Sequence, residues 1–269
     1  MRHETKEAPA VWTSAQWLEY FRANADRPLD CPWHLGVGAS TEEIALIVGS
    51  LRSWQLGETS DGAHLFETAQ RYADSEGDPE FVEVARLFIA EEQGHGEALG
   101  RFLDLAGVPR AQRDFGDTLF RAARHCLPGL EAWTTPVLMA EVHAMVYYNA
   151  IRKATGSLVL RRICERLLRD EVAHIRFQCE RLAILHRRRP CWLRALTMGG
   201  HYVLFLAVTL GIWAGHRKAL RAGGYDFGHF WRSAWDRMKH AWRALSPDAY
   251  QWEGASRPVE VRGEPIGSA

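Results

Sequence analysis

The sequence predicts an all-α protein, built as a four-helix bundle with an N-terminal helix and additional C-terminal helices. Apolar residues recur at helical spacing along several long segments, capping motifs mark helix starts, and turn residues divide the segments into two hairpins joined by a longer crossover. With 269 residues, 47% of them hydrophobic, the chain is long enough for one large domain with an appendage. We expect a leader over 1–40, the bundle over 41–189, apolar and amphipathic helices over 190–246, and a disordered tail over 247–269.

Two capping boxes mark the first helix starts. Thr13 and Gln16 open a short amphipathic helix in the leader. Ser40 and Glu43 open a helical run that we expect to continue unbroken to about Ser75. Apolar residues of this run recur in a heptad-like stripe, which is typical of a helix that buries one face in a bundle.

Three further helices complete the predicted bundle. The second helix of the bundle is expected over 79–106, with Asp78 as its N-cap and Pro79 as its first residue. The third helix is expected over 129–154 and the fourth over 157–188. The crossover over 107–128 is expected to hold a short helix near 117–124. Short turns join the helices within each hairpin, so the paired helices run antiparallel.

Six titratable residues continue the apolar stripes of these helices, where side chains point inward. They are Glu58, Glu92, His95, Glu141, Glu171 and His174. Glu67 lies about half a turn away from Glu58 and is expected to face outward, whereas Asp61 remains an alternative to Glu58. His143 is two positions past Glu141 and is expected to face elsewhere.

The predicted turns place these residues at matching heights. The midpoint between Glu58 and Glu92 is residue 75, at the edge of the first turn. The midpoint between Glu141 and Glu171 is residue 156, on the second turn. Each hairpin therefore contributes one lone glutamate and one Glu-x-x-His motif at a common level.

Carboxylates and imidazoles gathered inside a bundle need a partner, because an unpaired buried charge costs several kcal/mol. Four carboxylates and two imidazoles are a ligand set suited to two divalent Fe or Mn ions. The i, i+3 spacing places Glu and His on one helix face, where both can reach an ion. Two 2+ ions also balance the charge of four carboxylates. The sequence therefore predicts a dinuclear metal centre, with a metal-free bundle of solvated glutamates and hydrogen-bonded histidines as the alternative.

The set formed by Glu58, the two Glu-x-x-His motifs and Glu141 resembles the ferritin-like di-iron carboxylate superfamily, over about residues 41–188. That superfamily includes ferritins, rubrerythrins and the small subunit of ribonucleotide reductase. The resemblance implies that Glu92 and Glu171 bridge two irons. It also implies that each iron takes one terminal pair of ligands, Glu58 with His95 and Glu141 with His174.

The resemblance also implies that two acidic residues hydrogen-bond the histidine ligands and orient them. Asp170 would hydrogen-bond His95 across the bundle, and Glu91 would do the same for His174. Both could equally be exposed acids. Tyr148 lies two turns from the glutamate of its helix and is a candidate catalytic residue that could donate a hydrogen bond or be oxidised, with a simple core aromatic as the alternative.

The function that this resemblance implies is oxidation of a small organic substrate by O2 or peroxide, using two Fe ions or an Mn/Fe pair. We expect the substrate near Trp54, Phe88, Met145 and Tyr148. The five cysteines include no Cys-x-x-Cys pair, so electrons are expected to come from an external donor. Ferroxidase or rubrerythrin-like handling of iron or peroxide is an alternative function, and a purely structural bundle is another.

The region over 195–246 leaves two interpretations open. Residues 195–215 contain no Asp, Glu, Lys or Arg, and an aromatic face follows on a basic helix over 227–242. These helices could pack on the bundle or on a second subunit in a homodimer, or they could associate with a membrane surface. The latter would fit a membrane-associated di-iron quinol oxidase or hydroxylase. Equal numbers of basic and acidic residues, 33 of each, give no support to nucleic-acid binding, and we expect a cytoplasmic protein that is either soluble or peripheral to the membrane.

Overall fold

The computed structural model describes residues 8–59, 62–114, 116, 118 and 129–252. Over these residues the chain is all-helical, as predicted, and contains no β-strand. Its α-helices are α1 (Ser14–Ala25), α2 (Thr41–Gly57), α3 (Ala63–Glu76), α4 (Glu80–Leu105), α6 (Leu130–Ala154), α7 (Leu158–Arg187), α8 (Cys191–Ala222) and α9 (Phe227–Ala244). Two 3-10 helices, Trp33–Leu35 and Pro247–Ala249, complete the described elements. The short helix expected near 117–124 falls largely outside the described residues.

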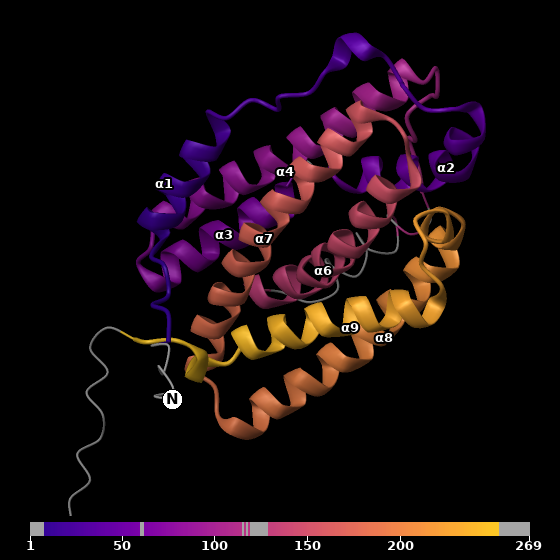
Figure 1. Ribbon diagram of the computed structural model, residues 1–269. Helices are drawn as coiled ribbons and strands as arrows, with labels where there is room; N and C mark the ends of the chain where they lie inside the picture. Colours follow the sequence, from indigo (N-terminus) through magenta and orange to yellow (C-terminus); the bar gives the residue numbers. More distant parts are fainter. Residues whose placement is uncertain (1–7, 60–61, 115, 117, 119–128, 253–269) are drawn as a thin grey trace, which may run out of the picture.

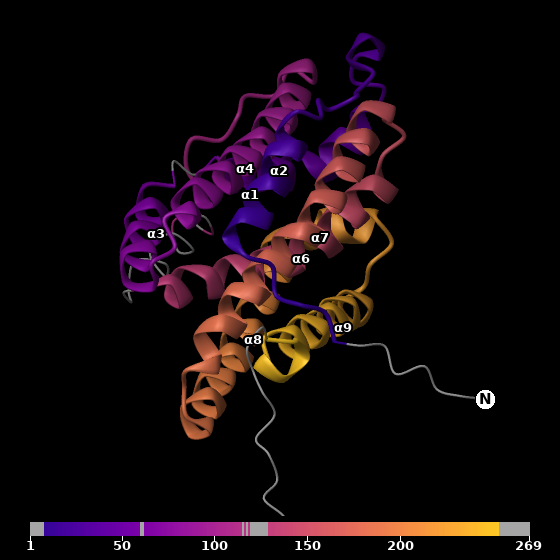
Figure 2. The same cartoon turned by 90° about the vertical axis from the view of Figure 1, so that its left-hand side faces the viewer.

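The long helices α4, α6 and α7 lie side by side with α2 and α3 (Figure 1). Their buried apolar residues form two clusters, one in which α2 packs with α4, α6 and α7, and one in which α3 packs with the same three helices. The leader helix α1 lies across α4 on one side of this group. Helices α8 and α9 lie along the opposite side, against α6 (Figure 2). The capping box predicted for Thr13 and Gln16 is present at the start of α1, and so is the one formed by Ser40 and Glu43 at the start of α2.

The expectation of one unbroken helix from Ser40 to Ser75 is wrong. Helix α2 ends at Gly57, and α3 begins at Ala63 after Gly62, whose φ of 71° is a left-handed conformation that glycine adopts without strain. Two glycines within six residues weaken a helix at this point. As a result, Glu58 is the C-cap of α2 and does not lie in mid-helix.

The second hairpin turns where the sequence predicted, at Thr155-Gly156-Ser157. The Ser157 hydroxyl accepts a hydrogen bond from the Leu160 amide and caps α7. The carboxylate of Glu43 accepts a further bond, of 2.8 Å, from the Gly156 amide. The start of α2 is thereby fastened to the turn between α6 and α7.

Helices α8 and α9 pack on protein to different extents. The aromatic face of α9 turns toward α6, α7 and α8, and Phe230 and Trp242 are buried there. By contrast, only 17% of the most apolar stretch of α8 is buried. Among the described helices, α8 is the one that has the length and apolar composition to cross a membrane.

The chain ends lie near each other where the structure describes them. The Gln251 amide donates a hydrogen bond of 3.0 Å to the Pro9 carbonyl, beside an isolated bridge between Ala10 and Gln251. The disordered tail was predicted from residue 247, but residues 247–252 include a 3-10 helix and this contact. The rest of that prediction, over 253–269, lies outside the described residues.

Candidate metal centre

Four helices bring the six predicted residues together in the interior. Glu58 is the C-cap of α2, α4 carries Glu92 and His95, α6 carries Glu141, and α7 carries Glu171 and His174. Five of the six are buried, and the side chain of Glu92 is 15% exposed. The common height inferred from the two turns is therefore present in the fold, even though the first helix is interrupted.

The six side chains form two overlapping groups that could hold metal ions. One group contains Glu58, Glu92, His95 and Glu171, and the other contains Glu92, Glu141, Glu171 and His174. Within each group, one ligand atom from every residue lies within 4.8 Å of the others. Glu92 and Glu171 belong to both groups, so the arrangement has two adjacent sites with two shared carboxylates.

Several polar atoms of this cluster are buried without a hydrogen-bond partner, although buried polar atoms are normally bonded. They are Glu92 Oε1, His95 Nδ1, Glu141 Oε2, Glu171 Oε2, and both ring nitrogens of His174. The Nδ1 of His174 lies 2.7 Å from Glu92 Oε1, so these two atoms form an ion pair although their geometry is not that of a hydrogen bond. Inward-facing lone pairs of carboxylate and imidazole are what a divalent cation requires, so the residues present fit a metal pair.

Burial and mutual repulsion act against ionisation of two of the carboxyl groups. The pKa of Glu58 is raised well above its ordinary value, first by burial and then by the nearby charge of Glu92. The pKa of Glu141 is likewise raised well above its usual range, by burial and by the charge of Glu171. In the absence of cations these two groups hold protons more tightly than ordinary glutamates.

Glu92 and His174 behave as an ion pair. Burial alone would raise the pKa of Glu92, but the adjacent His174 outweighs it and lowers that pKa to about 2. Burial alone would lower the pKa of His174, but the charge of Glu92 raises it well above its ordinary value. In the metal-free cluster the charged forms of Glu92 and His174 are therefore favoured, whereas the charged forms of Glu58 and Glu141 are disfavoured.

The predicted contact between Asp170 and His95 is present. Asp170 is buried, and its Oδ2 lies 3.1 Å from His95 Nε2. Arg166, one turn earlier on α7, donates to the same oxygen at 2.5 Å. Burial favours the neutral acid, but the bonds from His95 and Arg166 outweigh it and hold the pKa of Asp170 at about 2. A charged Asp170 orients the His95 ring so that Nδ1 faces the cluster.

The predicted hydrogen bond between Glu91 and His174 is not made. Glu91 Oε2 lies 3.7 Å from His174 Nε2, which is too long for a hydrogen bond. Glu91 accepts a bond from the amide of Asn24 on α1 instead, and Asn24 also reaches Asp170 at 3.4 Å. The leader helix thus contributes a polar side chain next to the cluster.

Tyr148 and Gln178 contact one glutamate each. The Tyr148 hydroxyl donates a bond of 2.5 Å to Glu58 Oε1, and both residues are buried. The pKa of Tyr148 is raised well above its ordinary value by burial and by Glu58. The amide of Gln178 donates to Glu141. These bonds fix one oxygen of each glutamate.

Aromatic side chains shield the cluster from water. Phe88 packs edge-on against His174, with ring centroids 4.8 Å apart, and Phe21 of α1 lies 6.1 Å from the same ring. Trp54 lies against Tyr148, with centroids 5.6 Å apart. Met145 is half-buried on α6. The region expected to hold substrate is therefore apolar, and the substrate assignment itself stays a prediction.

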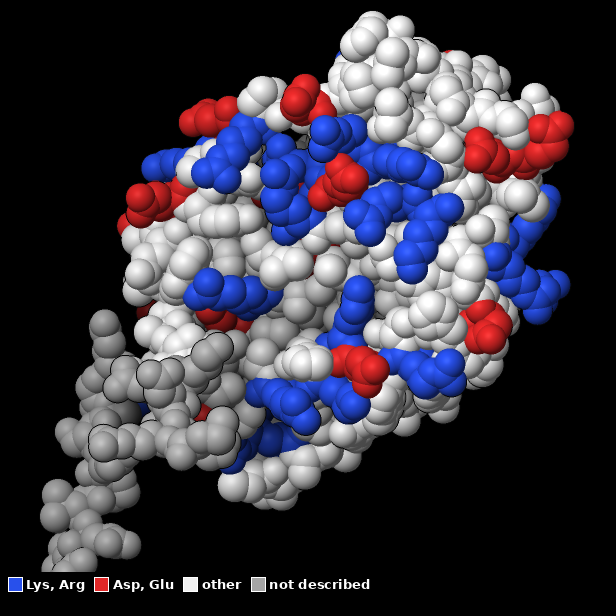
Figure 3. Space-filling model, in the orientation of Figure 1, with Lys and Arg blue, Asp and Glu red and all other residues white. Residues whose placement is uncertain are grey.

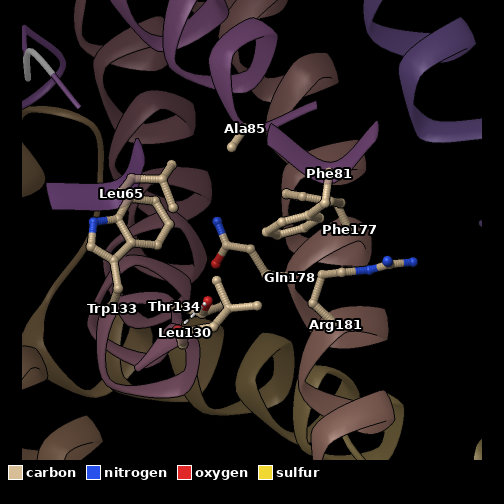
Figure 4. Close-up of a pocket in the computed structure, with 9 residues that line it drawn as sticks. All are labelled: Leu65, Phe81, Ala85, Leu130, Trp133, Thr134, Phe177, Gln178 and Arg181. Atoms are coloured by element: carbon tan, nitrogen blue, oxygen red, sulfur yellow. Dashed lines mark hydrogen bonds between the residues drawn. The ribbon is translucent and has the colours of Figure 1, made fainter. Parts of the chain in front are cut away.

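A narrow apolar pocket between α3, α4, α6 and α7 reaches the inner end of Gln178 (Figure 4). Figure 4 shows the Gln178 amide pointing into this pocket, between Trp133 and Phe81. The amide oxygen has no hydrogen-bond partner. The amide nitrogen of Gln178 donates a hydrogen bond to Glu141, so this side chain connects the pocket with the carboxylate cluster.

The sequence identified the six residues that the structure brings together, but it did not identify Asn24 and Gln178 as hydrogen-bond donors to nearby carboxylates. Asn24 follows Trp17 and Phe21 at the spacing of one helix face, and that pattern was the available signal. Gln178 follows Glu171 and His174 on the same face of α7. Asp61, the alternative to Glu58, lies outside the described residues.

Two exclusions made from sequence are confirmed. Glu67 is exposed on α3. His143 faces away from the cluster, and its ring nitrogens contact the Met139 carbonyl at 2.6 Å and the Thr209 hydroxyl at 2.9 Å. Burial lowers the pKa of His143 to about 4, so this histidine is neutral near pH 7.

In comparisons with protein-family models, with curated proteins and with solved structures, nothing matches this chain. What the structure establishes is a helical protein with buried Glu and His groups that could bind a metal ion.

Proposed function

We propose that this protein is a ferritin-like di-metal oxidoreductase that uses O2 or peroxide to oxidise a small organic substrate. One observation carries the proposal: two adjacent ligand groups share Glu92 and Glu171 deep inside a helical protein, with unpartnered atoms on both histidines. A structural bundle would gain nothing from such a cluster, because buried unpaired polar atoms destabilise the fold.

In this proposal Glu92 and Glu171 would serve as ligands to both ions of a pair, either two irons or one manganese and one iron. Glu58 with His95 would complete the ligands of one ion, and Glu141 with His174 those of the other. The two groups found in the structure divide the six residues in this way.

A bound metal pair would supply the electrons for reduction of O2 or peroxide. The remaining tasks belong to the chain itself. Asp170 orients His95, and Gln178 holds one oxygen of Glu141. Tyr148 holds a proton on its hydroxyl, 2.5 Å from Glu58. Phe88 and Phe21 exclude water beside His174, which strengthens electrostatic interactions in the cluster.

The five cysteines of the sequence include no Cys-x-x-Cys pair of the kind that holds a built-in electron carrier. The proposal therefore assigns electron delivery to a separate reductase.

Metal stoichiometry tests the proposal most directly. The purified protein is loaded with Fe(II) without oxygen, the bound iron is counted, and O2 is added while optical and Mössbauer spectra are recorded. We expect two irons per chain that are oxidised together and give the spectrum of a coupled pair. Binding of one iron or fewer per chain would overturn the dinuclear assignment, and thousands of irons per assembled particle would indicate storage instead.

Removal of a shared carboxylate provides the matching mutational test. In Glu92→Ala and Glu171→Ala we expect loss of both ions with the helical circular dichroism retained, since each variant removes an oxygen donor from both groups. Glu165→Ala on α7 is the control, because its side chain is exposed and pairs with Arg162 at the surface. Two tightly bound ions in either bridging variant would contradict the ligand assignment.

A further inference from the structure

Helix α8 has an inner face that is fixed to the rest of the protein. Three polar contacts, spread over about four helical turns, hold it to α6 and α2: His201 to Thr135 (3.2 Å), Thr209 to His143 (2.9 Å) and His216 to Ser50 (2.9 Å). Lys218 adds a bond of 2.9 Å to the Ala45 carbonyl. Helix α8 therefore lies along the bundle as part of it.

The outer face of α8 is apolar and exposed. Residues 195–215 contain no Asp, Glu, Lys or Arg, so the exposed surface along this stretch is uncharged. Leu196 and Val203 are 68% and 70% exposed. Further large exposed side chains on this helix are Trp192, Tyr202, Leu206 and Leu210. At 1.5 Å per residue the uncharged stretch is about 30 Å long, and a continuous apolar surface of this length marks an interaction site.

Positive charge flanks this face at both ends, and at the first of them Arg188 and Arg189 also pair with Glu76 and Glu131. Residues 187–245 contain eleven Lys and Arg and only two acidic residues, a net charge of +9, while the chain as a whole is neutral. Basic residues flank both ends of the uncharged stretch: Arg187, Arg188, Arg189 and Arg194 before it, and Arg217, Lys218 and Arg221 after it. Figure 3 shows Lys and Arg over the part of the molecule where α8 and α9 lie, with few acidic side chains among them, and a denser group of Lys and Arg over the upper part of the molecule.

We propose that the outer face of α8 docks on an anionic phospholipid membrane, with the helix lying flat in the interfacial region. An apolar helix face bordered by Lys and Arg is the pattern that enters the boundary between headgroups and acyl chains. The basic border is complementary to anionic headgroups. Trp192, at one end of the face and 68% exposed, is the residue type that favours this interface.

Two other arrangements fit the molecule less well. A second copy docked through the same face would bring the basic residues that flank the two uncharged stretches together, and like charges in an interface are unfavourable. A membrane-crossing α8 would have to leave α6 or carry the bundle into the bilayer, because the contacts of His201, Thr209 and His216 fix its inner face. The flat orientation keeps these contacts. The proposal does not depend on the metal centre.

Cosedimentation with vesicles tests the docking. The full-length protein is mixed with vesicles of phosphatidylcholine alone, or of phosphatidylcholine with phosphatidylglycerol. We expect binding to the anionic vesicles to be at least about tenfold tighter, and to weaken with added salt. The pair Arg217→Gln and Arg221→Gln should weaken binding to anionic vesicles by about fivefold for each arginine.

The apolar face is tested by Leu196→Glu combined with Val203→Glu. Both side chains are mostly exposed, so the packing of α8 on α6 is retained and circular dichroism should be unchanged. We expect loss of binding to both kinds of vesicle. Leu158→Glu is the control, because Leu158 is also exposed, at 56%, but lies at the start of α7.

Three results would overturn the proposal. The first is absence of binding to anionic vesicles by the unmodified protein. The second is a dimer in sedimentation velocity that the double glutamate variant disperses, without any binding to vesicles, since this would assign the face to a second copy. The third is a chain that leaves cell membranes only in detergent and not in alkaline carbonate, which would show that α8 crosses the bilayer.

Discussion

Tyr148 is the nearest hydroxyl donor to the carboxylate cluster among the contacts that the structure describes. Its bond to Glu58 is short, at 2.5 Å, and neither residue is open to solvent. The neighbouring Tyr147 is equally buried, but its hydroxyl contacts Ser50, at 3.0 Å. The two adjacent tyrosines thus offer a matched pair for separating an effect on the cluster from an effect on packing.

We expect Tyr148→Phe to weaken binding of one of the two metal ions by about tenfold, because loss of a partner that orients a ligand has effects of this size. Tyr147→Phe should leave both affinities unchanged. Anaerobic titration with Mn(II), followed by electron paramagnetic resonance, measures the two steps. Equal affinities in the two variants would mean that the bond to Glu58 plays no part in metal binding.

At the residue scale, sequence patterns found the groups that carry charge and missed the groups that orient them. The six candidate ligands stood out because a charged residue on an apolar stripe is unusual. Gln178 and Asn24 lie on helix faces too, but amides are common at many places in helices, and only the packing of α1 and α7 shows which carboxylate each one contacts.

The leader helix α1 is held in place by a buried carboxylate on α7. Glu180 is fully buried and accepts bonds from the Trp12 amide at 3.0 Å and from the Trp17 indole at 2.9 Å. Arg176, one turn earlier on α7, pairs with its second oxygen at 2.8 Å. This anchor positions Phe21 and Asn24 beside the cluster.

Glu180→Ala should reduce the free energy of unfolding by about 2–4 kcal/mol, because it leaves buried donors and a cation without their acceptor. Glu165→Ala, on the same helix but at the surface, should change it by no more than about 0.5 kcal/mol. Urea unfolding followed by circular dichroism measures both. Similar values for the two variants would show that α1 is not anchored through Glu180.

At the element scale, periodicity and capping residues predicted the helices, whereas the break between α2 and α3 was missed. The apolar stripe continues across the break, so the pattern alone suggested one helix. Gly57 and Gly62 were a local signal, but glycine within a helix costs only about 1 kcal/mol, and tertiary packing decides whether the helix continues.

The whole molecule carries an electrostatic cost that bound cations would relieve. In the metal-free fold the pKa values of Glu58, Glu141 and His174 all lie well above their ordinary values. A raised carboxyl pKa contributes stability that is lost as pH rises above about 4.5, and a raised imidazole pKa contributes stability that is lost above about 6.5. The low pKa of Glu92 acts only in the acid range, below about 4.5.

We therefore expect the metal-free protein to become less stable between pH 6 and pH 8, and the gain in Tm on adding Mn(II) to grow over the same interval. Binding of the two ions should release protons from the cluster, because the pKa values of Glu58, Glu141 and His174 are raised in the metal-free fold and ligand atoms must be deprotonated. Calorimetry in buffers of different ionisation enthalpy counts these protons. A gain in Tm that shrinks with rising pH would contradict this electrostatic account.

For the whole molecule, the sequence predicted a central group of helices with a leader helix and C-terminal helices. It did not decide whether residues 195–246 pack on protein or associate with a membrane. Both helices in that region are apolar on one face, and a pattern cannot tell which face meets protein. The fold resolves the question for α9, which buries Phe230 and Trp242 against the neighbouring helices, and leaves α8 with its apolar face in solvent.

Gly96 directly follows His95 on α4, and it faces the point where α2 ends. A methyl group there would lie 2.9 Å from the Thr59 side chain, closer than such atoms approach in proteins, and 3.2 Å from Glu58 Cβ, which is tighter than most such contacts. Because Gly96 has no side chain, Glu58 and Thr59 at the end of α2 can pack directly against α4. During evolution, a larger residue at position 96 would require the segment between α2 and α3 to move away from α4. We therefore expect Gly96 and the break between α2 and α3 to be retained together.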